Sequence, residues 1–170
     1  MADDSRPAIK TFQTKHDEFL FLGKEYPLDS DMGAVWGDFI GSGGYEINAQ
    51  HGLYQYTCMI LYHNNNSESI TYTPGTIVGD IDEVPEGYVL GKYPAREYLV
   101  VTTDWMEDAE EASGENGLWY TKAYQETAPM PEGYERFDGP GSQINVIEVE
   151  NTNTEHGSRW EWWVPIRRIT

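Results

Sequence analysis

The sequence predicts an α+β fold in which a strand-helix-strand-strand unit occurs twice and forms one antiparallel sheet with two main helices. Three observations predict it: short apolar runs typical of strands, two helical segments, and the same order of elements in both halves. The tripeptide Gly-Tyr-Glu also follows both predicted helices, at residues 44–46 and 133–135. We therefore expect two repeats, at about 17–80 and 88–168, in one domain with a ligand-binding cleft between the halves.

The first half of the chain begins with a polar segment, residues 1–16, which we expect to be flexible. The apolar residues 19–22 predict a buried strand, and the side chains of residues 29–31 can accept hydrogen bonds at a helix start. The glycine-rich segment 41–44 is expected to end this helix. The helix presents five apolar residues on one face: Met32, Val35, Trp36, Phe39 and Ile40.

Further strands complete each half. In the first half, residues 53–62 and 69–78 are rich in alternating apolar residues, and a polar loop at 63–67 joins them. In the second half, an acidic stretch lies between the first strand and the helix. The predicted elements of the second half are a strand at 98–103, a helix around 118–124, and strands at 143–150 and 158–167.

Charge and composition limit the partners. The chain has 170 residues, which suits one domain, and it carries 29 acidic against 11 basic residues, a net charge of -18. This charge would repel nucleic acid and anionic membrane surfaces. It either attracts cations or only keeps the protein soluble, and both interpretations stay open. No apolar run reaches the roughly 18 to 20 residues that span a bilayer, and the acidic start lacks a signal-peptide pattern. We expect a cytoplasmic protein.

The usual motifs for catalysis, metal binding and nucleotide binding are missing from the sequence. The glycines at 41–44 lack the following Lys-Ser/Thr step of a phosphate loop, and there is no nucleophile elbow. The four histidines have no metal-ligand spacing, and Cys58 is the only cysteine, so a disulfide within the chain or a thiolate metal cluster cannot form. We expect no catalytic residue, no metal and no cofactor.

One acidic residue stands inside an otherwise apolar strand. Strand alternation places Glu148 on the same face as Ile144 and Val146. Glu148 either faces solvent or lies in a cleft, and both interpretations stay open. The last strand divides its residues between two faces, with Glu161 and Trp163 on one and Trp160, Trp162 and Val164 on the other.

Aromatic residues are abundant, with 6 Trp, 12 Tyr and 5 Phe. A carboxylate in a cleft walled by such rings is suited to a lipophilic cation, which is held by charge, ring faces and apolar contact. Cation–π contacts contribute ~0.5 to 2 kcal/mol each. Burying an apolar surface of roughly 200 Å2 adds about 5 kcal/mol. After the costs of association, micromolar affinity is the expected ceiling.

Several segments resemble the GyrI-like effector-binding domain, which ends some AraC-type and MerR-type regulators and also occurs as a standalone protein. The resemblance covers roughly residues 17–168. No helix-turn-helix accompanies the domain, so the chain looks like a standalone member, similar to the cationic drug-binding proteins of bacterial mobile integron cassettes. The segments that carry the resemblance are residues 93–98, the helix with Trp119, and residues 130–135, 147–148 and 161–166.

The resemblance implies a drug pocket between the two repeats, with Glu148 at its floor as the counter-charge of a small lipophilic cation. It maps an aromatic residue of the closing strand, two positions before Pro165, onto Trp163. The family often has Tyr two residues after the Glu, where this chain has Glu150. Either a second acid lies near the pocket mouth or the strand register differs, and a place for Glu161 is also open. The candidate walls are Trp36, Phe39, Trp119, Tyr124 and Trp163.

Two other function classes stay open. Some members of this family act on DNA gyrase or on a transcription factor, which implies an interaction module with a regulatory protein partner. Others are hydrolases of reactive small molecules, in which Glu148 would be the base. Direct binding of nucleic acid is not expected, and an edge strand could pair two copies into a homodimer.

Overall fold

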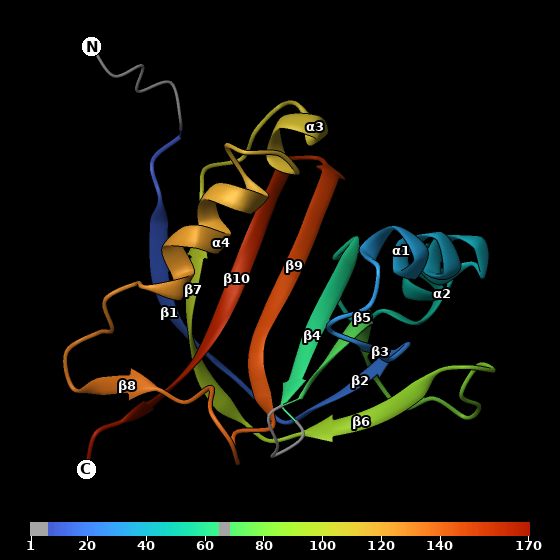
Figure 1. Ribbon diagram of the computed structural model, residues 1–170, viewed down its shortest axis with the longest axis horizontal. Helices are drawn as coiled ribbons and strands as arrows, with labels where there is room; N and C mark the ends of the chain where they lie inside the picture. Colours follow the sequence, from blue (N-terminus) through green and yellow to red (C-terminus); the bar gives the residue numbers. More distant parts are fainter. Residues whose placement is uncertain (1–6, 65–68) are drawn as a thin grey trace.

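The computed structural model describes residues 7–64 and 69–170. Within these residues ten strands form one antiparallel sheet, and four helices accompany it (Figure 1). The predicted α+β class with a single antiparallel sheet is thereby confirmed. The strands are β1 (Lys10–His16), β2 (Phe19–Gly23), β3 (Tyr26–Pro27), β4 (Cys58–Asn64), β5 (Ile70–Val78), β6 (Val89–Tyr93), β7 (Arg96–Thr102), β8 (Tyr134–Arg136), β9 (Ile144–Thr154) and β10 (Gly157–Arg168). The helices are α1 (Met32–Gly41), α2 (Gly44–His51), α3 (Ala109–Ala112) and α4 (Leu118–Glu126).

The strand order is mirrored about the centre of the sheet. It runs β1-β7-β10-β9-β4-β5-β2-β6, with β3 beside β5 and β8 beside β10. From the central pair of β9 and β4, the order outward is β10 then β7 on one side, and β5 then β2 on the other. The outermost strands are exchanged, because β1 precedes β2 in the chain but pairs with β7, while β6 precedes β7 but pairs with β2. This exchange interlocks the two halves.

Both outermost strands differ from the expectation drawn from the sequence. Residues 1–16 were expected to be flexible, but Lys10–His16 pairs along its whole length with Arg96–Thr102. The polar sequence of β1 gives no strand signal, and the strand forms because its backbone satisfies the otherwise open edge of β7. Residues 1–6 lie outside the described residues. β6 and the short β8 were also not predicted.

Helix α1 begins and ends as its sequence predicts. The Asp31 side chain accepts a 3.0 Å hydrogen bond from the Gly33 N–H and caps the helix, and Val35 and Phe39 are buried. The glycine-rich segment ends α1, but a second helix, α2, starts at once after Gly43, whose φ is +83°. α2 was missed because residues 44–51 have no apolar face of helical period.

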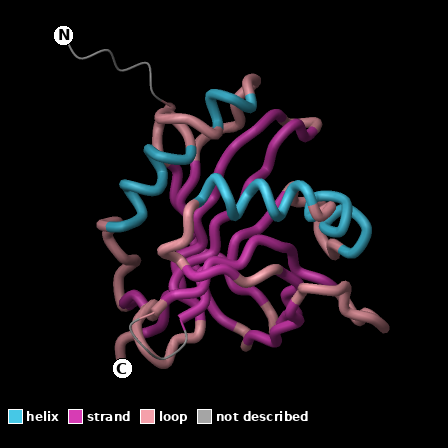
Figure 2. Tube along the Cα trace, turned by 45° about the vertical axis from the view of Figure 1, so that its right-hand side comes forward, coloured by secondary structure: helices cyan, strands magenta, loops and turns pink. Residues whose placement is uncertain are grey.

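The sheet carries separate apolar clusters on its two faces. On the helix-covered face, one cluster lies beneath α3 and α4 and another beneath α1 and α2, and Tyr62 packs against both. Figure 2 shows both helix pairs against the strands. A third cluster occupies the opposite face and joins Tyr93 of β6 to Tyr98 of β7, so the sheet curls around it. None of the described helices has the length and apolar character needed to cross a bilayer.

Candidate ligand-binding site

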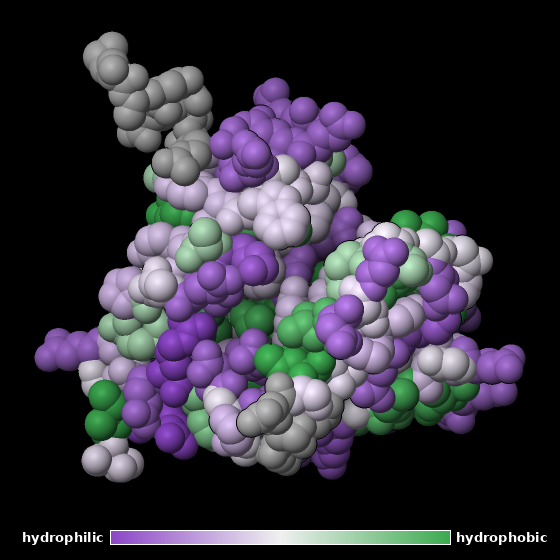
Figure 3. All heavy atoms as spheres, in the orientation of Figure 1, coloured by the Kyte–Doolittle hydropathy of each residue, from purple (hydrophilic) through white to green (hydrophobic). Residues whose placement is uncertain are grey.

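A cavity of about 890 Å3 opens on the helix-covered face, between α1 and α4 and above the central strands. Its volume lies within the range of roughly 300 to 1,000 Å3 that is usual for small-molecule sites. In Figure 3 the surface is hollowed between the two helix-bearing halves, with hydrophobic residues gathered there. Seven aromatic side chains line the cavity: Trp36, Tyr45, Tyr62, Tyr72, Trp119, Trp160 and Trp162.

Glu148 lies on the cavity floor, in the middle of β9, and is only 5% exposed. The Tyr62 hydroxyl donates a 2.8 Å hydrogen bond to Glu148 Oε1. The Trp160 indole N–H donates a 2.7 Å hydrogen bond to Glu148 Oε2. Burial raises the pKa of Glu148, and the two hydrogen bonds oppose this shift because they favour the charged form. Both oxygens of the carboxylate are therefore held in place by neutral donors.

Glu150 follows on the same face of β9 and also lines the cavity. The Tyr45 hydroxyl of α2 donates a 2.9 Å hydrogen bond to Glu150 Oε2. Burial raises the pKa of Glu150 to about 7, the Tyr45 hydrogen bond lowers it, and the neighbouring charge of Glu148 raises it again. Strand β9 thus contributes two carboxyl groups to the cavity lining, those of Glu148 and Glu150.

The basic residues of the cavity lining are bound to other acids. Lys122 Nζ lies 2.8 Å from Glu126 Oε1 one turn along α4, and Arg136 Nε lies 2.8 Å from Asp138 Oδ2. In residues 7–64 and 69–170 no basic side chain forms an ion pair with Glu148 or Glu150. The charge of Lys122 also lowers the pKa of Glu148, but its effect is smaller than that of either hydrogen bond.

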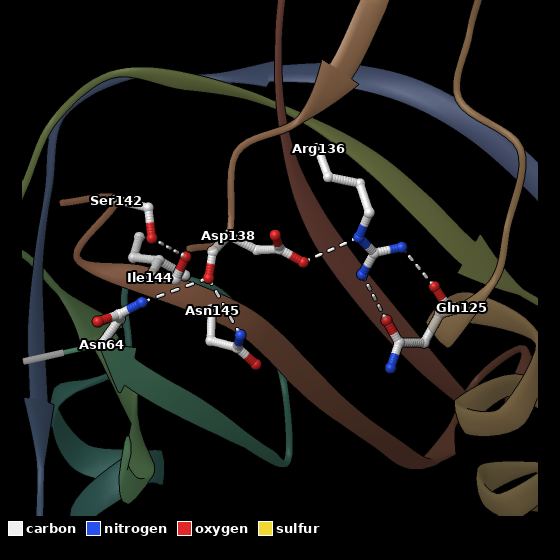
Figure 4. A network of polar contacts seen from close by, with 7 residues as sticks. All are labelled: Asn64, Gln125, Arg136, Asp138, Ser142, Ile144 and Asn145. Carbon is white, nitrogen blue, oxygen red and sulfur yellow. Dashed lines mark hydrogen bonds and ion pairs between the residues drawn. The ribbon is translucent and has the colours of Figure 1, made fainter. Parts of the chain in front are cut away.

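A polar network fixes the side of the cavity formed by the end of α4 and the loop before β9 (Figure 4). Arg136 Nη1 donates to the Gln125 backbone oxygen at 2.7 Å, and Arg136 Nη2 donates to Gln125 Oε1 at 3.3 Å. The backbone oxygen of Asp138 accepts hydrogen bonds from Asn145 Nδ2 at 3.1 Å and from Asn64 Nδ2 at 3.4 Å. The network ties α4 to β8, β9 and β4, so the cavity wall has a defined position relative to its floor.

The structure brings together three of the six residues proposed as the site. Glu148, Trp36 and Trp119 line one cavity. Phe39 is fully buried in the cluster beneath α1 and α2, and Tyr124 packs against the cluster beneath α4. Neither ring lines the cavity, because each points from its helix into the core. These two residues support the walls rather than form them.

Trp163 was expected in the cavity wall, but the structure places it on the opposite face of the sheet. Its indole N–H donates a 3.1 Å hydrogen bond to Glu161 Oε1, and Glu161 forms a 3.2 Å ion pair with Arg159. The physical reason is the two-residue period of a strand: Trp162 pairs directly with Glu148 and shares its face, so Trp163 points away. Glu161 does not join the cavity for the same reason.

The residues that sequence reasoning missed are aromatic side chains around the two acids, of which Tyr45, Tyr62 and Trp160 donate hydrogen bonds to them. Trp160 and Trp162 could have been found, because they share a face of β10 and Glu148 lies on the neighbouring strand. Tyr45 and Tyr62 had no such signal, since their contacts with Glu150 and Glu148 span 105 and 86 residues of sequence. No group of three or more metal-binding side chains occurs among the described residues.

Three solved structures are similar to this chain in fold. SAV2435 bound to tetraphenylphosphonium aligns with a TM-score of 0.64 and 10% identity, covering 93% of this chain and 94% of that one. The integron cassette protein VCH_CASS2 from the mobile metagenome of Vibrio cholerae aligns with a TM-score of 0.56 and 11% identity, covering 92% and 95%. The C-terminal domain of EcmrR aligns with a TM-score of 0.52 and 14% identity, covering 95% and 99%.

Sequence comparison places the chain more firmly than these structural likenesses, which at such identities show the fold alone. No curated protein matches it in sequence. The family of integron-associated effector binding proteins matches residues 8–166, which is nearly the whole chain. The chain therefore belongs to the family of integron-associated effector binding proteins.

Proposed function

We propose that this effector-binding protein binds lipophilic organic cations in the aromatic cavity, with Glu148 as the counter-charge. The observation that carries the proposal is the state of Glu148, a carboxylate 5% exposed at the cavity floor, whose hydrogen-bond donors among the described residues are the neutral Tyr62 and Trp160. A buried charge without an ionic partner is costly, and a bound cation would remove that cost.

The cavity walls suit such a ligand. Trp36 and Trp119 border the cavity from α1 and α4, and the indole faces can contribute cation–π contacts of about 0.5 to 2 kcal/mol each. A lipophilic cation gains from this lining because it needs few hydrogen bonds. The similar fold of SAV2435, whose structure contains tetraphenylphosphonium, supports the same ligand class for this chain.

We propose a binding protein without catalytic activity, located in the cytoplasm. Both oxygens of Glu148 already accept hydrogen bonds, which favours a fixed counter-charge over a base that must move a proton. The hydrolase and the protein-interaction module stay alternative predictions, as do a regulatory protein partner and a homodimer.

The test is calorimetric titration of the protein with tetraphenylphosphonium, beside neutral triphenylphosphine oxide. We expect saturable, roughly micromolar binding of the cation and at least tenfold weaker binding in Glu148→Gln, because glutamine keeps the shape and an acceptor but removes the charge. The neutral compound should bind weakly to both proteins. Binding of the cation with unchanged affinity in Glu148→Gln would refute the counter-charge role.

Glu83→Gln is the matched control. Glu83 is exposed and lies outside this cavity. Glu83→Gln removes one acidic side chain, as Glu148→Gln does, so the two variants have the same formal net charge. If general attraction to an acidic protein caused the binding, both variants would lose affinity equally. A loss confined to Glu148→Gln assigns the effect to the cavity.

A further inference from the structure

The two carboxylates of the cavity floor define the ligand class more narrowly. We infer that the site is built for organic dications, with one cationic centre at Glu148 and the other at Glu150. This inference rests on the proposed function, because it concerns the same cavity. It starts from Glu150, the second carboxylate of the cavity floor.

The charges of the cavity lining point to a ligand of charge +2. Six charged residues line the cavity. Lys122 is neutralised by Glu126 and Arg136 by Asp138, so the two bases cancel two acids. The remaining acids, Glu148 and Glu150, leave a formal charge of -2 within the described part of the wall. A dication would balance this charge, whereas a monocation would leave one carboxylate to be protonated or uncompensated.

The two carboxylates are held apart by separate partners. Glu148 accepts from Tyr62 and Trp160, on strands to either side of β9, whereas Glu150 accepts from Tyr45 on α2. They are two residues apart on one strand face, which separates their Cα atoms by roughly 7 Å at about 3.3 to 3.4 Å per residue. Two fixed anionic positions with this spacing fit a ligand with two separated cationic centres.

Aromatic rings accompany both anionic positions. Beside Glu150, the ring of Tyr45 is stacked on that of Trp36, with centroids 6.4 Å apart and an interplanar angle of 24°. Beside Glu148, the indole of Trp160 contacts the carboxylate, and Trp162 lies directly across the strand pair. A flat aromatic dication therefore finds ring surface along its whole length, as well as a carboxylate at each end.

Two probes of matched shape separate charge from size. Methyl viologen carries two methylated pyridinium rings, and 1-methyl-4-phenylpyridinium has one of those rings replaced by a neutral phenyl ring. In calorimetric titrations at fixed ionic strength and pH 8, we expect the parent protein to bind methyl viologen at least tenfold more tightly. Glu150→Gln should lower the affinity for methyl viologen at least tenfold more than the affinity for the monocation, so that this preference is lost.

A second measurement needs no variant. Glu150 faces Tyr45 from α2, Cys58 from β4, Tyr72 from β5 and, on its own strand, Glu148. At pH 7 Glu150 is about half protonated, so binding of a dication should draw it into its charged form and release up to about half a proton. Titrations in buffers of different ionisation enthalpy should show more proton release with methyl viologen than with the monocation.

The outcomes distinguish the two proposals. If neither probe nor tetraphenylphosphonium binds the parent protein, the proposed function fails. If the cations bind but methyl viologen binds the parent protein no more tightly than the monocation does, the dication inference is overturned and the proposed function stands. The same conclusion follows if Glu150→Gln still prefers methyl viologen. Equal proton release with both probes would also overturn it. Glu83→Gln should keep the full preference and so controls for net charge.

Discussion

The indole N–H of Trp160, which stands opposite Glu150 in the β9–β10 pair, donates a 2.7 Å hydrogen bond to Glu148 Oε2. The Tyr62 hydroxyl donates to the other oxygen of Glu148. The two hydrogen bonds fix the orientation of the carboxyl group, and neither donor carries a charge. The fold thus presents a carboxyl group of fixed orientation at the bottom of an aromatic cavity. Such preorganisation would lower the cost of ordering the site for the proposed cation.

Removing one of these donors should weaken both the fold and the site. In Tyr62→Phe, Glu148 loses the hydrogen bond that favours its charged form, so its pKa rises and cation affinity at pH 7 falls. A hydrogen bond to a charged group contributes about 1.5 to 3 kcal/mol, so the free energy of unfolding should fall by a similar amount. Denaturant unfolding and calorimetric titration with tetraphenylphosphonium measure both effects.

Tyr88→Phe is the matched control for Tyr62→Phe. The Tyr88 hydroxyl is buried and has no hydrogen-bond partner among the described residues. Its removal should therefore leave the free energy of unfolding unchanged or slightly higher, and cation affinity should not change. Equal losses of stability in the two variants would contradict the role given to the Tyr62 hydroxyl.

Glu150 should make the unliganded protein less stable as the pH rises. Its pKa is about 7 in the folded protein and 4.5 as the ordinary value, so the folded state holds the proton more tightly than the unfolded state. The stabilisation is present below pH 4.5 and is lost as the pH rises through about 7, a change on the order of 3 kcal/mol. Glu148 acts in the same direction, because burial also raises its pKa.

Urea unfolding between pH 4.5 and pH 8 tests this dependence. Glu150→Gln has no charge to gain, so its free energy of unfolding should fall less over this range than that of the parent protein. Glu83→Gln should show the full dependence, because that side chain is exposed. An unchanged dependence in Glu150→Gln would show that the carboxylate is not the group responsible.

The sequence predicted correctly those strands and helices whose own residues show a clear apolar or capping pattern. The apolar run at 19–22, the Asp31 cap and the apolar face of α1 predicted β2 and α1 correctly. Glu148 stood out as an acid inside an apolar strand, although the sequence left open whether it faces solvent or a cleft. In β2 and α1 local chemistry and tertiary structure agree, so pattern reasoning succeeds there.

The remaining features depend on partners distant in the sequence. β1 forms because β7 offers an open edge, and its own residues are polar. Tyr45 meets Glu150 only because α2 packs against the sheet. Trp163 was placed in the wall through a family motif, and an error of one residue in a strand reverses the face. The pairing of strands decides which face of the sheet a side chain lies on, and this pairing cannot be inferred from the residue pattern of one sequence.

Two tryptophans should separate binding from stability. Trp119 is 57% exposed on α4 and lines the cavity, so Trp119→Ala should lower cation affinity by about threefold to tenfold with little change in stability. Trp163 is 5% exposed on the opposite face, and Trp163→Ala should lower the free energy of unfolding by about 3 to 5 kcal/mol. Folded Trp163→Ala protein should keep its cation affinity.

Titration calorimetry and thermal unfolding of both variants provide the measurement. Phe39→Ala extends the comparison, because Phe39 is fully buried beneath α1 and does not line the cavity. It should behave like Trp163→Ala in stability. A specific loss of cation affinity in folded Trp163→Ala, with no loss in Trp119→Ala, would reverse the assignment of the two faces.

A buried hydrogen bond between β10 and α4 helps to hold α4 over the cavity. The Trp162 indole N–H donates to Thr121 Oγ1 at 2.9 Å, and both residues are almost fully buried. Thr121→Val keeps the volume but leaves the indole N–H without an acceptor, which should lower the free energy of unfolding by about 1 to 3 kcal/mol. Thr121→Ser keeps the hydroxyl and should cost less. Equal losses in the free energy of unfolding of the two variants, measured by denaturant unfolding, would show that the hydroxyl does not hold α4 in place. A larger loss in Thr121→Val, together with weaker cation binding, would show that this hydrogen bond positions the wall that carries Trp119.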